Sequence, residues 1–375
     1  MPVGEAARDI KAADRPLVSV LVPVLDEASS IRDTVAAMLA QRVTGPIELL
    51  LADGGSSDGT RALLEELAAD DPRVRVLRNP RGWTPSGLNI CLRHARGEYV
   101  ARMDAHSFYP EGYLQAGIDR LRAGGTDWVS GPQTIAGAGR VQRAFALALE
   151  SPLGRGGSRR WAAGLGHGEV RREWDLDSGV FTGVWRREKV LEMGGWDERW
   201  WRNQDSEMAA RFLEQGSRLV CLAEMAARYL PRDTLRGLAR QYEGYGFYRA
   251  ATARRHPDTL RRSALLMPLL VCCWILALLA PRPLRGLARV GVAVYVATLA
   301  ATGTVAARKS PPAVAASVPL VLATMHLSAG LGFLRGMRNF GVPWQALARI
   351  AAIPGHERFA SRATEEAVYA PSLER

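Results

Sequence analysis

The sequence predicts an α/β domain built on a mainly parallel sheet, followed by a membrane-inserted C-terminal region. In the first hundred residues, short apolar runs alternate with helical stretches of about 10–15 residues, which is typical of βαβ units with helices on both faces of the sheet. Further along the chain, three long stretches carry almost no charge. The mean hydropathy of −0.08 is an average over these two different parts of the 375-residue chain.

The strands of the N-terminal part are β-rich apolar runs such as VSVLVPV and IELLLA. Between them, we expect helices capped by Ser30 and Ser86, and another opened by Asp58. After residue 110 the pattern loosens. The Gly- and Arg-rich segment 153–172 is interpreted as a mobile loop and a candidate lid, and 198–216 as a loop that enters a helix. The expected strands lie at 18–24, 47–52, 74–77 and 99–103.

Three apolar stretches predict two to three membrane-spanning helices, because each is near the ~20 residues needed to cross a bilayer core. The single charge in them is Arg289, at the edge of the second. Arginines at 254, 255, 261 and 262 precede the first stretch and favour a cytoplasmic catalytic side. Arginines also follow the first and third stretches, so one stretch could be re-entrant or interfacial. The stretches are 263–280, 288–306 and 311–334.

The composition limits the classes of function. The net charge of +11 comes from 49 basic and 38 acidic residues, and next to a membrane segment it favours anionic lipid or phosphorylated substrates. The positive charge is scattered or membrane-proximal, which argues against a nucleic-acid binder. The four cysteines show no metal or disulfide spacing. The first 16 residues have no apolar core, so no signal peptide is expected and the N-terminal domain should be cytoplasmic.

Acidic residues stand at three expected strand ends, where open α/β sheets bind ligands: Asp26-Glu27, Asp53 and Asp104. Neither a dinucleotide fingerprint nor a P-loop follows the first strand, which disfavours a dehydrogenase. Carboxylates there suit hydrogen bonds to a base or a ribose. Asp104 and His106 could place an oxygen and a nitrogen on one divalent ion, although alone such a pair more often belongs to a strand-end turn.

Four motifs in order, VSVLVPVLDE, ADGGSSDGT, RMDAHS and GGWDE…NQDSEMAARF, resemble the inverting family 2 glycosyltransferases of the GT-A fold. The resemblance covers about residues 17–216. Within this family, the sequence most resembles succinoglycan-type exopolysaccharide glycosyltransferases, in the segments NPRGWTPSGLN, MDAHSFYP and RQYEGYGFYRA. The family implies a Rossmann-like mixed sheet, a nucleotide-diphospho-sugar donor and a single displacement that inverts the anomeric centre.

The resemblance also implies roles for individual residues. Asp205 would be the catalytic base. Asp104 and His106 would hold Mn²⁺ or Mg²⁺ on the donor diphosphate. The other donor-binding residues would be Pro23, Glu27 and Asp53, and those on the acceptor side Trp196, Asp197, Gln241, Tyr242 and Arg249.

Several of these positions depart from the family pattern. Gly54 stands where a second Asp is usual, and Gln204 replaces the common Glu before the base. His106 replaces an Asp, which favours a borderline metal such as Mn²⁺. The acceptor motif is only partly recognisable. Trp196 could stack on a sugar ring, with aromatic packing as the alternative.

The sequence therefore predicts a multi-pass enzyme of the bacterial inner membrane. We expect it to move a hexose from a nucleotide-diphospho-sugar, a UDP-sugar in the first instance, to a lipid-linked saccharide in exopolysaccharide or cell-envelope synthesis. Alternatives are transfer to polyprenyl phosphate, or a non-catalytic nucleotide-sugar-binding scaffold. The expected divisions are 1–16 as a flexible N-terminus, 17–235 as the GT-A domain, 236–262 as membrane-proximal helices, 263–334 as the membrane region and 335–375 as the tail.

Overall fold

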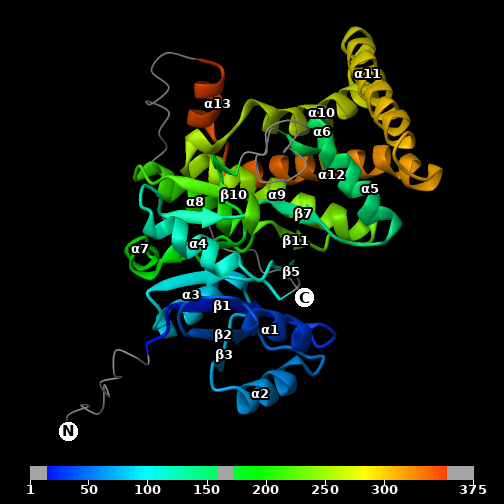
Figure 1. The fold of residues 1–375 in the computed structure, drawn as a ribbon. Coiled ribbons are helices and arrows are strands. Elements are labelled where there is room, and N and C mark those ends of the chain that lie inside the picture. Colours follow the sequence, from blue (N-terminus) through cyan, green and yellow to red (C-terminus); the bar gives the residue numbers. More distant parts are fainter. Residues whose placement is uncertain (1–14, 106, 157, 159–171, 353–375) are drawn as a thin grey trace. The chain divides into compact units, whose positions relative to one another are not determined.

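The computed structural model describes residues 15–105, 107–156, 158 and 172–352 (Figure 1). His106 and most of the predicted lid 153–172 lie outside these residues. The chain divides into two compact units, and the predicted domain 17–235 is shared between them. Unit 1 contains Met1–Gly131, Phe181–Trp196 and Ser217–Met225. Unit 2 contains Pro132–Val180, Asp197–Gly216 and Ala226–Arg375.

Unit 1 is built on a mixed sheet in the order β3-β2-β1-β4-β9-β6-β10. The first four strands are parallel, as the alternation of strands and helices predicts. β9 is antiparallel to both of its neighbours, β4 and β6, which makes the sheet mixed. The strands are β1 (Val18–Val24), β2 (Ile47–Asp53), β3 (Val74–Arg78), β4 (Tyr99–Arg102), β6 (Trp128–Ser130), β9 (Gly183–Arg186) and β10 (Leu219–Leu222).

Aliphatic side chains of β1, β2 and β4 form the centre of the unit 1 core, and helices cover them. The start of α2 agrees with the sequence, since Asp58 Oδ1 accepts from the Thr60 amide. Ser86, however, does not cap α3. The helix begins at Thr84, and the Ser86 hydroxyl donates to Asn79 and Trp83 instead. The elements are α1 (Ile31–Leu39), α2 (Thr60–Asp70), α3 (Thr84–His94), β5 (Ser107–Phe108), α4 (Tyr113–Arg122), α7 (Arg187–Glu192) and η3 (Ala223–Met225).

Unit 2 is mainly helical. Its parallel strand pair β7–β11 is short, and most of its core lies between helices. Its strands are β7 (Gln133–Ile135), β8 (Glu173–Asp175) and β11 (Ala227–Tyr229). Its helices are α5 (Arg140–Glu150), α6 (Pro152–Arg155), α8 (Gln204–Glu214), α9 (Leu235–Arg255), η4 (Pro257–Thr259), α10 (Arg262–Leu279), α11 (Arg282–Ala307), α12 (Pro312–Phe340) and α13 (Trp344–Ile350).

Helices α9 and α12 cross with almost no space between their backbones. A Cβ atom on Gly332 would lie 2.0 Å from the carbonyl oxygen of Glu243, and one on Gly246 would lie 2.0 Å from that of Ala329. Arg335 of α12 also pairs with Glu243 (2.5 Å). Small residues permit such close approach between helices, as they do inside membranes. The C-terminal part of α12 is therefore packed tightly on α9.

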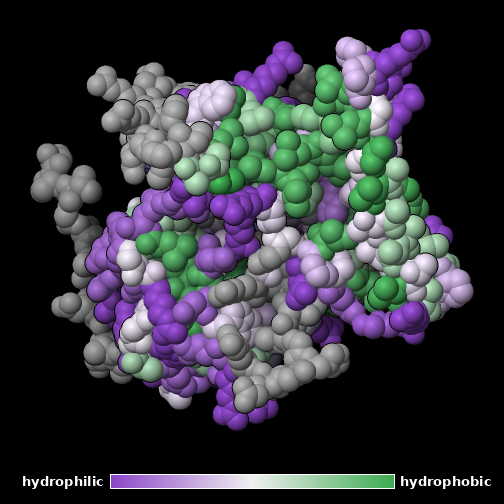
Figure 2. Space-filling view, turned by 90° about the horizontal axis from the view of Figure 1, so that it is seen from above, coloured by the Kyte–Doolittle hydropathy of each residue, from purple (hydrophilic) through white to green (hydrophobic). Residues whose placement is uncertain are grey.

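Three helices, α10, α11 and α12, are long and apolar enough to cross a membrane. α10 agrees with its predicted stretch to within one residue, whereas α11 begins six residues before residue 288 and α12 continues six residues past residue 334, to Phe340. Many large apolar side chains of α10 and α11 are exposed, including Leu269, Leu279, Leu287 and Val294. Figure 2 shows hydrophobic side chains gathered in a broad patch. Such a surface is far larger than isolated exposed apolar residues produce and indicates a lipid or protein environment.

Candidate active site

The carboxyl ends of β1, β2 and β4 lie at one edge of the unit 1 sheet. The chain runs outward from β1 through β2 to β3 and then returns to place β4 on the other side of β1. Open α/β sheets bind ligands beyond the strand ends at such a reversal of strand order. Asp53 ends β2 opposite Val24, and Asp104 follows β4 by two residues. The sheet thus brings two of the predicted donor-binding carboxylates to one edge.

Asp53 is buried, and one of its oxygens is held within its own loop. Oδ1 accepts from the Ser56 amide (3.2 Å) and the Ser56 hydroxyl (2.7 Å), whereas Oδ2 lies 4.0 Å from Nη1 of Arg61. Gly54, which replaces the usual second Asp, approaches Gly82 so closely that a Cβ would lie 3.2 Å from the Gly82 Cα. Its lack of a side chain therefore lets the loops after β2 and β3 meet.

The loop after β1 is tied to the loop after β2. Asp26 has a left-handed backbone (φ 53°), and its Oδ1 accepts from the Ser57 amide at 2.7 Å, so the carboxylate serves the turn. The Glu27 amide donates to the Thr60 hydroxyl (2.8 Å), and Glu27 Oε2 accepts from Ser30 (3.1 Å). Pro23 lies in β1 opposite Ala52. These hydrogen bonds fix Glu27 close to the predicted donor edge.

Asp104 is paired with a buried arginine. Nε and Nη2 of Arg102 donate to its two oxygens at 2.8 and 3.0 Å, and its amide donates to the Tyr109 hydroxyl at 2.8 Å. Burial raises the pKa of Tyr109 well above its ordinary value, and the Asp104 charge adds to the effect, so this hydroxyl stays protonated. Asp104 itself is nearly buried, with 8% of its surface exposed. The sequence analysis did not predict this role for Arg102, although an arginine two residues before an aspartate is a recognisable signal of such a pair.

The predicted metal site is represented by Asp104 alone. Among the residues that the structure describes, no group of three His, Cys, Asp or Glu side chains could hold a metal ion. The fork of Arg102 already neutralises the one carboxylate present. The described side chains therefore do not make a metal site by themselves, and any such site would need His106 and oxygens of the bound diphosphate.

In unit 2, the candidate base Asp205 lies in the first turn of α8. Asp205 is 9% exposed. It lies near the N-terminus of the helix, where the helix dipole stabilises a negatively charged carboxylate. The helix is preceded by Asn203 in a left-handed conformation (φ 59°), whose side-chain amide donates to the carbonyl of Tyr245 at 3.0 Å. Gly179 packs directly on this turn, because a Cβ there would lie 2.2 Å from the Asp205 carbonyl oxygen.

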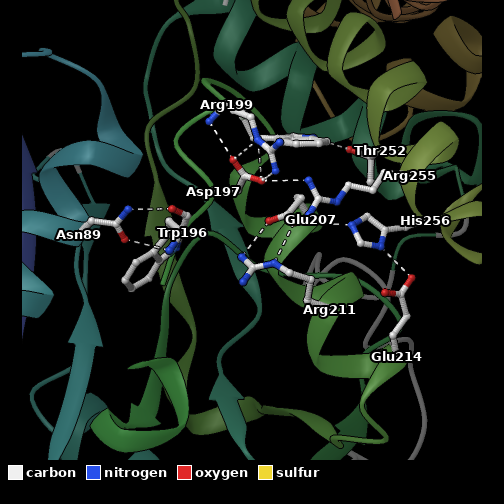
Figure 3. Close-up of polar contacts among 11 residues, drawn as sticks. Asn89, Trp196, Asp197, Arg199, Glu207, Arg211, Glu214, Thr252, Arg255 and His256 are labelled. Atoms are coloured by element: carbon white, nitrogen blue, oxygen red, sulfur yellow. Dashed lines mark hydrogen bonds and ion pairs between the residues drawn. The ribbon is translucent and has the colours of Figure 1, made fainter. Parts of the chain in front are cut away.

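Asp197 is held by two arginines (Figure 3). Arg199 forks onto its carboxylate, with Nε 2.9 Å from Oδ1 and Nη2 2.7 Å from Oδ2, and Nη1 of Arg255 lies 3.2 Å from Oδ2. Burial opposes ionisation, but the arginines outweigh it and lower the pKa of Asp197. Asp197 therefore links the loop before α8 to the end of α9. Its contact with an acceptor stays a prediction.

A second buried ion network joins α8 to the residue that ends α9 (Figure 3). Glu207 is fully buried, and Arg211 donates to its two oxygens at 2.8 and 2.9 Å. His256 lies between two acids, with Nε2 3.5 Å from Glu207 and Nδ1 2.7 Å from Glu214. Burial disfavours the Glu207 charge, but His256 and Arg211 lower its pKa overall. The i, i+4 spacing of Glu207 and Arg211 was visible in the sequence; His256 had no such signal.

The remaining acceptor-side residues lie in two places. Trp196 belongs to unit 1, is 2% exposed and packs edge-on against Trp185 at 5.9 Å. Asn89 accepts from its amide and donates to its carbonyl (Figure 3), so its surroundings support the packing alternative. Gln241 lies on α9 in unit 2 and donates to the hydroxyls of Tyr229 and Tyr245 at 2.8 and 2.9 Å.

Tyr242 and Arg249 are on the same helix as Gln241. The Tyr242 ring packs edge-on against Phe145 and Tyr245. Gln241, Tyr245 and Arg249 follow at intervals of four residues and so share one face of α9. The helix thus gathers the predicted acceptor motif, and contact of these residues with an acceptor stays a prediction.

Comparisons with known proteins agree with this fold. Residues 19–187 match the family described as glycosyl transferase family 2. The succinoglycan biosynthesis protein ExoA of Rhizobium meliloti is 32% identical over 86% of this chain and 95% of its own length. A chondroitin synthase of Pasteurella multocida is 31% identical over only 25% of this chain and 10% of its own length. The mannosyltransferase PcManGT of Pyrobaculum calidifontis, solved with GDP-Man and Mn²⁺, superposes with a TM-score of 0.53 at 21% identity, covering 85% and 87% of the two chains.

Proposed function

The chain belongs to glycosyltransferase family 2, and on this premise we propose that it transfers a hexose from a nucleotide-diphospho-sugar, a UDP-sugar in the first instance, to a lipid-linked saccharide. The product would be an exopolysaccharide or a cell-envelope glycan, in keeping with the role of the Rhizobium meliloti relative in succinoglycan biosynthesis.

The observation that carries the proposal is the pair of carboxylates at the edge of the unit 1 sheet. Asp53 ends β2 and Asp104 follows the end of β4 by two residues, and these two strands flank β1. Carboxylate oxygens accept hydrogen bonds from a base N–H or from ribose hydroxyls, whereas a pyrophosphate would be repelled there. We therefore assign Asp53, with Pro23 and Glu27, to the nucleoside of the donor, and Asp104 to the diphosphate, where a divalent ion would offset the negative charges.

Asp205 is proposed as the general base. It would take the proton of an acceptor hydroxyl while that oxygen forms a bond to the anomeric carbon. The bond from this carbon to the diphosphate oxygen breaks at the same time, and the nucleoside diphosphate leaves with the electron pair. One displacement inverts the anomeric centre, so an α-linked donor gives a β-linked product. Removal of a general base typically lowers the rate by about 10²–10⁴-fold.

A divalent ion, Mn²⁺ or Mg²⁺, held by Asp104 and His106, would supply positive charge to the leaving diphosphate. Independently of that ion, two residues of the chain would orient Asp104. Arg102 holds the Asp104 carboxylate in one orientation by its fork, and the Tyr109 hydroxyl holds the Asp104 backbone. Because Arg102 is buried and Tyr109 is partly buried, Asp104 would meet the donor without first reorganising.

The apolar helices supply a reason for the proposed acceptor. A saccharide on a polyprenyl carrier stays in the bilayer, so its transferase must work at the membrane surface. α10, α11 and α12 are long enough to insert, and arginines at 254, 255 and 261 precede α10, which itself begins at Arg262. We propose a multi-pass protein of the bacterial inner membrane with its catalytic units in the cytoplasm.

The test is nucleotide release by the full chain in detergent, over UDP-, GDP- and dTDP-sugars with Mn²⁺ or Mg²⁺ and a crude lipid-linked acceptor. One donor should turn over, and Asp205→Asn should lower its rate by about 10²–10⁴-fold. Asp233→Asn, the same change at an exposed acid, should leave the rate unchanged. Binding of one donor without turnover in the wild-type protein would refute the transferase and favour the nucleotide-sugar-binding scaffold.

A further inference from the structure

A long groove runs between α10 and α11. It has a volume of about 520 Å³, and its walls are apolar except for one guanidinium. Trp274, Ala277 and Leu278 form the α10 side, and residues from Arg289 to Ala300 form the α11 side. Small side chains such as Ala293 and Ala297 keep the two helices from filling the space between them. The groove is therefore shaped for an elongated apolar ligand with a negative charge at one end.

Arginines mark the charged end of the groove. Arg282, Arg285 and Arg289 follow at i, i+3 and i+7 and so share one face of α11 with the groove. Nε of Arg285 donates to the carbonyl of Ala280 (2.9 Å) and Nε of Arg289 to that of Ala277 (3.3 Å). These contacts hold both side chains against the last turn of α10.

No acidic residue is available to balance these arginines within the apolar region. The sequence from 262 to 340 contains no Asp or Glu. Guanidinium groups pair bidentately with phosphate oxygens, and a charge next to the hydrocarbon is costly until it is paired. An anionic phosphate at this end of the groove would supply the missing partner.

The length of the apolar part matches a lipid chain. Arg289 and Ala300 both line the groove and are eleven residues apart, which is about 16 Å along a helix at 1.5 Å per residue. One leaflet contributes about half of the ~30 Å hydrocarbon core, so an acyl chain that starts at the arginines would end near Ala300.

We propose that the α10–α11 groove is a specific site for one anionic phospholipid. Its phosphate would lie on Arg285 and Arg289 and one acyl chain along Ala293, Val296 and Ala297. The inference rests on the proposed membrane insertion and is independent of the sugar-transfer reaction. The site would fix the splayed pair α10–α11 in a bilayer that contains acidic lipid.

The experiment measures retention of single lipids by native mass spectrometry on the full chain in detergent. Phosphatidylglycerol and phosphatidylcholine with identical acyl chains are added in equal amounts. Phosphatidylglycerol should be retained at least tenfold better. A basic residue at a membrane surface contributes a factor of about five to anionic lipid binding, so R285Q/R289Q should lower phosphatidylglycerol retention by about 25-fold.

Two further variants separate the charge from the groove. Arg308→Gln removes one charge at the other end of α11 and should leave the preference intact. Ala297→Phe fills the groove and should lower retention of both lipids, while circular dichroism confirms an unchanged helix content. Equal retention of the two lipids by the wild-type protein, or an unaltered preference in R285Q/R289Q, would overturn the proposal. So would full displacement of phosphatidylglycerol by inorganic phosphate, which would mean that the arginines bind phosphate alone.

Discussion

Replacing Glu207 by Gln should destabilise unit 2 much more than the loss of an ordinary surface ion pair. The substitution keeps the shape of the side chain but removes its charge. It leaves Arg211, whose side chain is 17% exposed, next to a neutral amide, and it removes one of the two acids around His256. Breaking a buried ion pair by removing one partner costs about 3–5 kcal/mol.

The structure favours the lower end of that range. Arg211 keeps some access to water, so part of its charge can be solvated after the change. We therefore expect a loss of about 3 kcal/mol. For a unit of roughly 200 residues, 1 kcal/mol lowers the melting temperature by about 2–4 °C, which gives about 6–12 °C here. The assay is thermal unfolding in detergent, followed by tryptophan fluorescence.

Glu150→Gln is the matched control. Glu150 pairs with Lys309 at 3.1 Å in the same unit, but both side chains are about half exposed (46% and 61%). Exposed pairs of this kind contribute about 0–1 kcal/mol. The double variant Glu207→Gln/Arg211→Met should recover part of the loss, because it also removes the positive charge that Glu207 no longer offsets. Equal melting temperatures for Glu207→Gln and Glu150→Gln would refute the reasoning.

Three further predictions use other parts of the structure. Because its pKa is lowered, Glu207 binds a proton less readily in the folded chain than in the unfolded chain. Its contribution to stability should therefore be full above its ordinary pKa of 4.5 and lost as the pH falls through the folded value. When the melting temperature is measured at decreasing pH, the decline should be smaller in Glu207→Gln than in the wild-type protein. Gly332→Ala should cost about 1–3 kcal/mol because its Cβ would meet the Glu243 backbone, whereas Gly286→Ala, with open space around it, should be neutral or slightly stabilising; thermal unfolding compares them. Burial raises the pKa of the Cys91 thiol to about 12, so iodoacetamide at pH 8 should leave it unlabelled until the protein unfolds, as peptide mapping would report; labelling in the folded state would contradict its burial.

Local patterns predicted the parts of the fold that depend on neighbours in sequence. The runs VSVLVPV and IELLLA are strands β1 and β2, and the three apolar stretches are α10, α11 and α12. The predicted start of α3 is too late. Ser86 is a residue type that often caps helices, but here its hydroxyl donates to Asn79. A single residue type cannot distinguish these two uses of a hydroxyl.

Long-range pairing accounts for what the sequence did not reveal in the candidate site. The Asp197 carboxylate meets Arg255 at a separation of 58 residues, and His256 meets Glu214 at a separation of 42. Both contacts depend on how α8 packs against the end of α9, which no motif encodes. The acidic strand ends were predictable because parallel strands necessarily bring their carboxyl ends to one edge.

The packing of α5 against α12 also bears on the synthesis of the chain. Phe145 of α5 shares a buried cluster with Val321 and Met325 of α12, which lie about 180 residues later. At a translation rate of about 5–20 residues per second, α5 waits roughly 10–30 s after leaving the ribosome before its partner is made. During that interval its apolar face has no native cover from α12. Unit 2 is thus completed last, when the final hydrophobic helix arrives, and a chain that stops before residue 312 could not close its core.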